Sequence, residues 1–393
     1  MKYSGGKHAM EPFISPMLML FNAGVFLFWF SNHVPSPILP LYILDVTGQV
    51  QLSGLVVGAY GMAQLLLRIP VGLLSDRLGD RKRLTVAGAI FASLGCLGFL
   101  LSTHPALMFT SRFLSGIGAS FLVVFSVWYS SFFPPAMAHR AMGQLVFWGS
   151  LSQVAANLSS GWLAHEFGWL APFQVGAAAA IGAAFCWMGV SERNTYQSSR
   201  MNCKDMISVI FSRHLQKISL MGALGMFATF AIIYTSLPVH AKAMGASRID
   251  LGLLMGWNMI TYSGTAFLMG SRTLAGFSTQ RILQSGLCMS GISILLMPIM
   301  TSVWALYIPV GIQGMGRGLF YTALMAYALI PFSPEQKATA MGVFQAVYAL
   351  GMMLGPFSAG WIAQGAGLLW VFVIAGLGNL AALPASRHLE AAH

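Results

Sequence analysis

Charge is what this sequence lacks most. Only 8% of its 393 residues are charged, whereas 56% are hydrophobic and the mean hydropathy is +0.72. A water-soluble domain carries about a quarter charged residues, so this chain cannot cover a water-exposed surface with polar groups. Disordered chains are poor in apolar residues, which excludes disorder as well. The composition therefore indicates an integral membrane protein.

Motifs of covalent, metal and nucleotide chemistry are also missing. The four cysteines include no CxxC pair, so we expect neither a disulfide framework nor a metal site. The sequence contains no P-loop, GxSxG, HExxH or dinucleotide fingerprint. It also lacks the clusters of His, Asp and Glu that membrane enzymes place near one face. We expect no enzyme activity, no cofactor and no nucleic-acid partner.

Twelve apolar segments take up most of the chain. Continuous apolar runs of about 20 residues are typical of membrane helices, and they do not alternate as barrel strands do. We predict an all-α membrane protein with twelve transmembrane helices over residues 16–43, 52–74, 84–102, 106–132, 141–164, 169–190, 218–242, 250–270, 282–300, 303–330, 338–363 and 368–386.

Lysine and arginine are distributed unequally between the two sides of these segments. Of the 21 basic residues, 16 fall on the side that holds both termini, and only Lys242 and Arg248 fall on the other side. Arg68, Arg112 and Arg317 fall inside segments. The positive-inside rule places the richer side in the cytoplasm. We expect a multi-pass protein of the plasma (inner) membrane with both termini cytoplasmic.

The second half of the chain repeats the first at an offset of 198 to 199 residues. Gly116 and Gly118 correspond to Gly314 and Gly316, and the triplet 141–143 corresponds to 340–342. Such duplication is typical of transporters built from two six-helix bundles. We predict bundles at residues 1–190 and 218–393. The polar segment 191–217 should link them and contain a short amphipathic helix on the membrane surface.

The loop between the second and third segments resembles the signature of the major facilitator superfamily. It runs from Gly72 to Leu84, and only Asp80 departs from the pattern, where a basic residue is usual. The span count and the repeat extend the resemblance over the whole chain, which is most similar to the twelve-span drug/proton antiporter branch. The resemblance implies transport by alternating access of the two bundles.

By this resemblance, the loop would gate the cytoplasmic side through Gly72, Asp76, Arg77, Gly79 and Arg81. Asp76 would hold the halves together in the outward-open state. The eleventh segment begins on the same side at residues 333–336, Ser-Pro-Glu-Gln, which predicts a capped helix start. The alternative is a basic loop that only sets the topology.

The fourth segment contains Arg112, Gly116 and Gly118, which resemble the R-x-x-x-G-x-G motif of the same family. The family assigns this arginine to proton transfer or conformational coupling. The alternative is a structural arginine that binds neighbouring carbonyl groups. A buried arginine needs partners or a water-filled cavity in either case.

The antiporter branch usually carries a Gly-Pro pair in the fifth segment, and here residues 156–157 are Ala-Asn. The eleventh segment keeps the repeat-related pattern for helix packing at Gly351, Gly355, Pro356 and Gly360. This departure weakens the antiporter interpretation without removing it.

Arg317 is the single residue that points most clearly to a functional site, because it falls midway along the tenth segment. A lipid-facing arginine there would be very unfavourable, so we expect it to face a central cavity. Its guanidinium group suits an anionic or carbonyl-rich group, and a structural bond to another helix is the alternative. Arg68, near a segment end, could extend its charge to the interface, and we expect a structural role for it.

No carboxylate falls in the middle of a segment, so the titratable candidates are His33 in the first segment, His240 near the outer end of the seventh segment and, near the outer face, Asp45. Other polar residues that could line the cavity are Asn32, Asn157, Gln313, Tyr234 and Asn258. Ordinary packing and interhelical hydrogen bonds are the alternative for each of them.

These features together predict a secondary active transporter that exports a small amphiphilic organic compound, driven by protons. It should act as a monomer in the lipid bilayer and bind no metal. One alternative is transport, in either direction, of an anionic metabolite held by Arg317 and Arg112. A second alternative is a non-transporting membrane sensor with the same fold.

Overall fold

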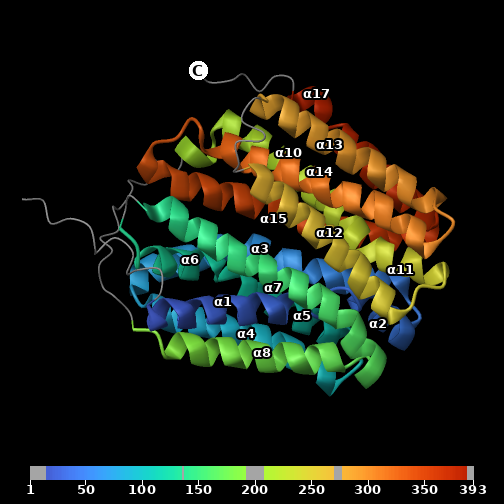
Figure 1. The fold of residues 1–393 in the computed structure, drawn as a ribbon, viewed down its shortest axis with the longest axis horizontal. Helices are drawn as coiled ribbons and strands as arrows, with labels where there is room; N and C mark the ends of the chain where they lie inside the picture. Colours follow the sequence, from blue (N-terminus) through green and yellow to red (C-terminus); the bar gives the residue numbers. More distant parts are fainter. Residues whose placement is uncertain (1–14, 135–136, 192–207, 270–276, 387–393) are drawn as a thin grey trace, which may run out of the picture.

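The computed structural model describes residues 15–134, 137–191, 208–269 and 277–386, with the side chains of 138–140, 334, 335 and 338 left out. Within these ranges the chain is helical and has no β-strand. The helices form two groups, which we call the N-terminal half and the C-terminal half (Figure 1). The first group, blue to green in the figure, precedes residue 191, and the second, yellow-green to red, follows residue 208.

The N-terminal half contains six helical stretches, two of them interrupted. Its helices are α1 (Pro16–His33), α2 (Leu39–Thr47), α3 (Val50–Leu78), α4 (Arg81–Leu101), α5 (Pro105–Ser120), α6 (Leu122–Ser130), α7 (Ala138–Phe167) and α8 (Ala171–Met188). The first stretch is α1 with α2, and the fourth is α5 with α6. Prolines at 35 and 37 lie in the break between α1 and α2, where their missing N–H groups and restricted backbone disfavour a continuous helix.

The C-terminal half repeats this plan. Its helices are α10 (Arg213–Ala231), η3 (Ile232–Ser236), α11 (Leu237–Ala243), α12 (Arg248–Met269), α13 (Thr279–Leu296), η5 (Met297–Ile299), α14 (Val303–Leu329), α15 (Pro334–Gly365), α16 (Leu368–Leu380) and α17 (Leu383–Ser386). The π-helical turn η3 interrupts the first stretch of this half shortly before Pro238. The break after α1 interrupts the first stretch of the other half in the same way, directly before Leu39. The twelve stretches predicted from the sequence are confirmed, and eight are long and apolar enough by themselves to cross a membrane.

The linker prediction falls mostly outside the described residues. Of the positions expected in an amphipathic helix there, 206 and 207 are not described, residues 208–210 are helical, and Arg213 already begins α10. Val209 is buried in one apolar cluster with Leu215 and Ile218 of α10. The chain therefore re-enters the C-terminal bundle before residue 218.

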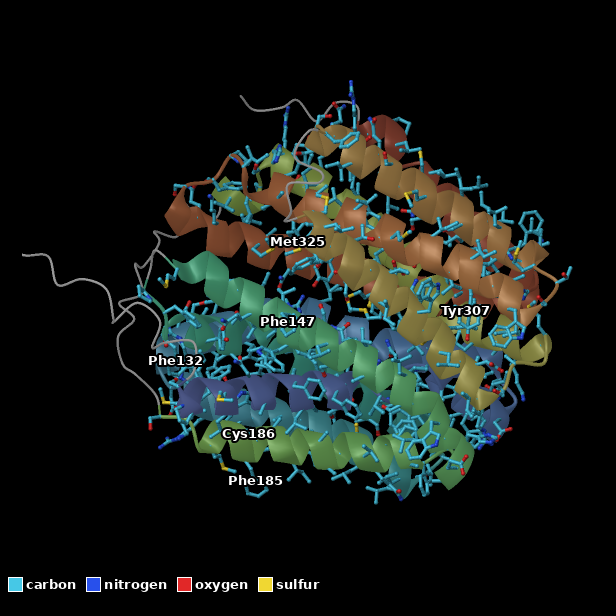
Figure 2. The ribbon with its side chains drawn as sticks, viewed as in Figure 1. Phe132, Phe147, Phe185, Cys186, Tyr307 and Met325 are labelled. Carbon is cyan, nitrogen blue, oxygen red and sulfur yellow. The ribbon has the colours of Figure 1, made fainter. Side chains whose placement is uncertain are left out.

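Each half has its own apolar core. In the N-terminal half, Phe21 and Phe28 of α1 pack against Phe125, Trp128 and Trp187, with ring centroids 4.9 to 6.0 Å apart. Phe185, beside Cys186 on the outer side of α8, points away from the bundle and is exposed (Figure 2). Apolar side chains on this outer surface suit contact with lipid.

Local capping defines several helix ends. The capping box predicted at the start of α15 is present, because the backbone N–H of Ser333 donates to the side chain of Gln336 at 3.2 Å. Gly79 ends α3 in the left-handed conformation, with φ +68°. Asp80 then caps α4 by accepting from the backbone N–H of Arg83 at 2.9 Å. This acceptor role explains an acid where the family pattern has a base.

The two halves meet along two pairs of helices, α3 with α15 and α7 with α12 (Figure 1). We call the end of the bundle that holds Leu78–Arg81 and the start of α15 the basic face. The other end, which holds residues 48–49, 168–170 and 244–247, is the opposite face. Helices α2 and α11 contact each other near the opposite face.

Glycines bring α3 and α15 together near the opposite face. A Cβ at Gly54 would overlap the carbonyl oxygen of Pro356, and one at Gly360 would lie 2.8 Å from the carbonyl oxygen of Gln51. Such distances leave no room for a side chain, because the backbones of the two helices touch.

The pair α7 and α12 is packed in the same way. A Cβ at Gly161 would overlap the carbonyl oxygen of Arg248, and one at Gly252 would lie 2.8 Å from that of Asn157. The repeat relates Gly54 to Gly252 and Gly161 to Gly360. The opposite face is therefore closed by four glycines in equivalent positions.

The same helices carry a second set of glycines near the basic face. Gly72, Gly143 and Gly342 each lie 18 residues, or five helical turns, from Gly54, Gly161 and Gly360, and so share the helix face of these partners. A Cβ at Gly143 or Gly342 would meet nothing within 4 Å, and one at Gly72 would meet only Val123 of its own half, at 3.8 Å. Gly58 and Gly61, further along α3, also lie against the backbone of α15 at Met353 and Met352. The tight glycine contacts between the halves thus extend from the opposite face to the middle of the helices, and they are absent at Gly72, Gly143 and Gly342.

Candidate substrate site

Four of the candidate polar residues of the bundle interior come from four different stretches. These four stretches contain α1, α7, α12 and α14. None of the four is long and apolar enough by itself to count as a membrane-crossing helix. They carry His33, Asn157, Asn258 and Arg317. Arg68 and Arg112, on α3 and α5, add two more buried side chains with positive charge.

Arg112 of α5 is buried, with 6% of its surface exposed. Its guanidinium group lies over the ring of Tyr60, 4.5 Å from the ring centre. It makes no hydrogen bond within the described residues, and its Nε is buried without a partner. A structural arginine bonded to neighbouring carbonyls, the alternative expected for this position, is therefore not what the described chain shows.

Arg317 of α14 has the same exposure, 6%, and a similar environment. Its guanidinium group lies over the ring of Tyr262, 4.2 Å from the ring centre, and Nη2 donates to Met259 Sδ at 3.5 Å. A thioether is a weak acceptor, and Nε has no partner in the described residues. Arg317 is directed into the protein rather than toward lipid.

Arg68 does not extend to the interface, although its position near a segment end would allow it. Only 2% of its surface is exposed. Its Nη1 donates to the hydroxyl of Tyr348 at 3.1 Å, and this hydrogen bond joins α3 of one half to α15 of the other. A nearby acceptor across the boundary between the halves explains why the side chain stays inside.

His33 is the last residue of α1. The charges of Arg112 and Arg317, which come from different halves, both act on its ring. Its Nδ1 is buried without a hydrogen-bond partner in the described residues, and its ring lies 5.8 Å from that of Trp29. The structure thus brings His33, Arg112 and Arg317 into one region.

Two of the amide candidates bind each other. Asn258 Nδ2 donates to Gln313 Oε1 at 2.8 Å and to the carbonyl of Val310 at 2.9 Å, which joins α12 to α14 within the C-terminal half. Asn32 Nδ2 donates to the carbonyl of Phe28 in its own helix at 2.9 Å. These contacts assign a packing role to Asn258 and to one end of Gln313.

Some candidate groups keep unused hydrogen-bonding capacity. Within the described residues, Gln313 Nε2, Asn32 Oδ1 and Asn157 Oδ1 are buried and have no partner. Tyr234 of η3 packs against Phe230 with ring centroids 4.8 Å apart, and it lies within electrostatic reach of Arg112. Buried polar groups are normally satisfied, so these atoms are available to water or a ligand.

The gating residues lie at the basic face. Asp76 and Arg77, in the last turn of α3, are both exposed, and Asp76 makes no hydrogen bond or ion pair with the described residues. The close approach expected at Gly72 is absent in this conformation. Arg81 begins α4 directly after the cap formed by Gly79 and Asp80. The gate therefore stays a prediction about a conformation closed at the basic face.

The motif glycines of the fourth and eleventh stretches lie at helix crossings. A Cβ at Gly116 would lie 2.5 Å from the carbonyl oxygen of Tyr60, and one at Gly118 would lie 2.7 Å from that of Gly88. Gly355 and Gly351 face the backbone of α10 in the same way. The close contact between Gly116 and Tyr60 positions the ring of Tyr60, which stacks on the guanidinium group of Arg112.

Arg248 is a residue whose role sequence reasoning missed. Its Nη1 donates to the carbonyl of Ala164 at 2.7 Å, and its guanidinium group lies 3.9 Å from the ring centre of Trp169. Both contacts cross from the C-terminal half to the N-terminal half at the opposite face. The sequence did contain a signal for this role, because Arg248 is a basic residue on a side of the membrane that has almost no others.

Other possible sites are less suited to a charged ligand. An apolar pocket of about 250 Å³ between α4 and α8, lined by residues such as Ile90, Leu94, Ile181 and Phe185, contains Ser93 as its polar side chain and no charged residue. Among the described residues, no group of three or more His, Cys, Asp or Glu could hold a metal ion.

The sequence profile of the Major Facilitator Superfamily matches residues 21–244 and 218–389, which together cover nearly the whole chain. The chain belongs to the major facilitator superfamily. This transporter is therefore a multi-pass membrane protein that binds a small-molecule substrate, and it is not an enzyme.

Named relatives are distant. The transporter is 33% identical over 151 residues to the multidrug transporter protein MdtP of Bacillus subtilis, covering 36% of this chain and 26% of the relative. It is 26% identical over 341 residues to the inner membrane transport protein YajR of Escherichia coli, covering 83% and 72%. The solved structure of the nucleoside transporter NupG, as its D323A mutant, has a TM-score of 0.81 at 13% identity, covering 95% and 100%. At that identity, the likeness shows the fold alone.

Proposed function

We propose that this protein is a secondary active transporter that works by alternating access. It exports a small amphiphilic organic compound from the cytoplasm in exchange for protons. It acts as a monomer in the plasma (inner) membrane, with both termini in the cytoplasm. The observation that supports this proposal is the contact between the two halves, because its tight glycine packing runs from the opposite face to the middle of the helices and is absent at Gly72, Gly143 and Gly342.

Alternating access requires that the interface between the halves can close at either face in turn. The glycines at 54, 161, 252 and 360 pack between the halves, whereas those at 72, 143 and 342 share the same helix faces and have open space. Two equivalent glycine sets support a molecule that can close at each face by the same type of packing.

The orientation follows from charge. Arg77, Arg81, Lys82 and Arg83 lie at the basic face, and positive residues are retained on the cytoplasmic side of a membrane. The structure is then closed toward the outside, which is the state in which an exporter takes up its substrate. The partial similarity to a multidrug transporter supports the same direction and an amphiphilic substrate.

Proton coupling needs a group that titrates within the membrane. The described carboxylates lie at helix ends or in caps, namely Asp45, Asp76, Asp80, Glu166 and Asp250. His33 is a titratable group on which charges from both halves act, those of Arg112 and Arg317. We propose His33 as the proton-binding residue, and Asp45 is the alternative candidate for this role.

Inside-out vesicles with an imposed proton gradient test this function. A pH-sensitive dye reports the gradient while amphiphilic compounds of positive, neutral and negative charge are added in turn. We expect at least one compound to dissipate the gradient in vesicles that contain the protein. Vesicles without it should show no response. The variant His33→Gln should lose proton exchange, whereas Asp45→Asn should retain it.

Two results would count against the proposal. Substrate movement that persists when an ionophore collapses the gradient would contradict proton coupling. The absence of movement of any compound, in vesicles whose protein is shown to be folded, would favour a non-transporting sensor.

A further inference from the structure

In the part of the chain that the structure describes, the interior of the bundle contains buried positive charge and no carboxylate. Arg68, Arg112 and Arg317 are all at least nine-tenths buried. The described carboxylates all lie at the two faces, so none of them neutralises these arginines. Burying a charge is costly unless a partner compensates it. Among the described side chains, none therefore supplies a negative counter-charge at the boundary between the halves.

The donors of these arginines are mostly unused. A guanidinium group offers five N–H donors in a planar fork. Within the described residues, Arg112 uses none of them in a hydrogen bond, and Arg317 uses one, with the sulfur of Met259. Arg68 donates to Tyr348. Arg112 and Arg317 thus have the greatest remaining capacity to bind an acceptor.

Tyrosine rings hold the guanidinium groups in position. Arg112 lies over Tyr60 at 4.5 Å, and Arg317 lies over Tyr262 at 4.2 Å. Stacking of this kind occupies one face of the guanidinium plane and leaves its N–H edge free. That edge matches the two oxygens of a carboxylate, sulfonate or phosphate group.

The two arginines belong to different halves but act on one place. Arg112 is on α5 of the N-terminal half and Arg317 is on α14 of the C-terminal half. The charges of both reach His33. A negative group bound beside His33 would therefore interact with both halves at once, and its release would remove a contact that joins them.

We propose that the substrate of this transporter is a small organic anion. Its oxyanion group accepts hydrogen bonds from Arg112 and Arg317, and its apolar body lies against the neighbouring tyrosines, including Tyr60 and Tyr262. This inference rests on the proposed transport function and adds the charge of the substrate to it. It also assigns Arg317 to binding rather than to helix packing.

Three compounds with one body and different charge provide the test. The probes are 2-naphthalenesulfonate, which is always negative, 2-naphthalenesulfonamide, which is neutral near pH 7, and 2-naphthyltrimethylammonium, which is always positive. Equilibrium dialysis against the purified full-length protein measures binding, and uptake into proteoliposomes measures transport. We expect the sulfonate to bind at least about tenfold more tightly than the other two, because charge-assisted hydrogen bonds are stronger than neutral ones.

Variants then identify the binding residues. Arg112→Gln and Arg317→Gln should each weaken sulfonate binding by about tenfold or more. Arg281→Gln removes the same charge from an exposed position at the start of α13, and binding should be unchanged. If a Gln variant fails to elute as a single species, Arg112→Lys and Arg317→Lys replace it. These keep the charge but lose the fork, and should bind with intermediate affinity.

The outcomes separate the site from the transport function. Sulfonate binding that depends on both arginines supports the site even if proteoliposomes show no transport, which would refute only the proposed function. Equal or tighter binding of the ammonium or neutral probe overturns the anionic substrate. So does unchanged sulfonate affinity in both arginine variants, or no sulfonate binding up to millimolar concentration.

Discussion

Arg248 is a side chain that joins the two halves at the opposite face. It combines a hydrogen bond to the carbonyl of Ala164 with stacking on Trp169, and both partners lie in the other half. A hydrogen bond from a charged group contributes roughly 1.5–3 kcal/mol, and about 1.4 kcal/mol changes a population ratio tenfold. The loss of this contact should therefore shift the balance between a state closed at the opposite face and any other state by about tenfold or more.

We predict that Arg248→Gln lowers the population of the state closed at the opposite face. The measurement is the rate at which a membrane-impermeant maleimide labels Gly342→Cys from the basic face, in a background without the four native cysteines. The rate should fall severalfold when Arg248 is replaced, because the basic face closes more of the time. Arg281→Gln serves as the control. An unchanged labelling rate would show that Arg248 does not hold the halves together.

Two acids four residues apart should behave differently. Asp76 is exposed and has no partner in the described residues, whereas Asp80 caps α4. We predict that Asp76→Asn reduces transport at least severalfold without changing thermal stability, because it removes a charge needed when the basic face closes. Asp80→Asn should leave both unchanged, since asparagine is also a good N-cap. Equal transport in the two variants would indicate that the loop only sets the membrane topology and does not act as a gate.

At the scale of the helix, the spacing of glycines is the informative feature. Helices α3, α7 and α15 each place two glycines five turns apart on one face, and in each pair only the glycine near the opposite face is in close contact. The repeat supplies Gly252 on α12, whose counterpart at position 270 lies outside the described residues. The helices therefore present a small-residue surface at each end, which is what close approach of two backbones requires.

We predict opposite consequences for substitutions in the two glycine sets. Gly342→Leu should fold with little loss of stability, because nothing lies within 4 Å of the new Cβ. It should still bind substrate but transport it poorly, because the leucine blocks closure of the basic face. Gly54→Leu should lower the melting temperature, since the Cβ would overlap the backbone of α15. Thermal unfolding and transport rates are the measurements, and full transport by Gly342→Leu would contradict the model of paired glycine sets.

At the scale of the whole molecule, the two faces should open and close in alternation. Spin labels at Val46 of α2 and Ala243 of α11 report on the opposite face, where these helices meet. Labels at Arg83 of α4 and Lys337 of α15 report on the basic face. We predict that conditions that lengthen the first distance shorten the second, because rigid halves rock about the site between them.

Pulse dipolar spectroscopy at acidic and alkaline pH, with and without substrate, measures both distances. Labels placed within one half, at Arg83 and at Ser191, provide the control and should not move. Opening of both faces together would contradict rocking of rigid halves and indicate a channel-like molecule.

The sequence identified much of the candidate site, but it did not identify the residues that contact the arginines of the site. Arg112 and Arg317 stood out because charge within an apolar segment is expensive wherever the fold places it. The rings of Tyr60 and Tyr262 that stack on them come from other helices, which sequence spacing does not reveal. The same limit applies to Arg68, whose acceptor Tyr348 is 280 residues away.

The sequence by itself determined the membrane location, the twelve helical stretches and the duplicated halves. These follow from composition and from periodicity within single segments, because lipid forces each apolar segment to satisfy its own backbone as a helix. Only the tertiary structure decided which face is closed, which glycines touch and which arginines lack partners. Those properties depend on the approach of helices that are far apart in the sequence, and the periodicity within a single segment carries no information on that approach.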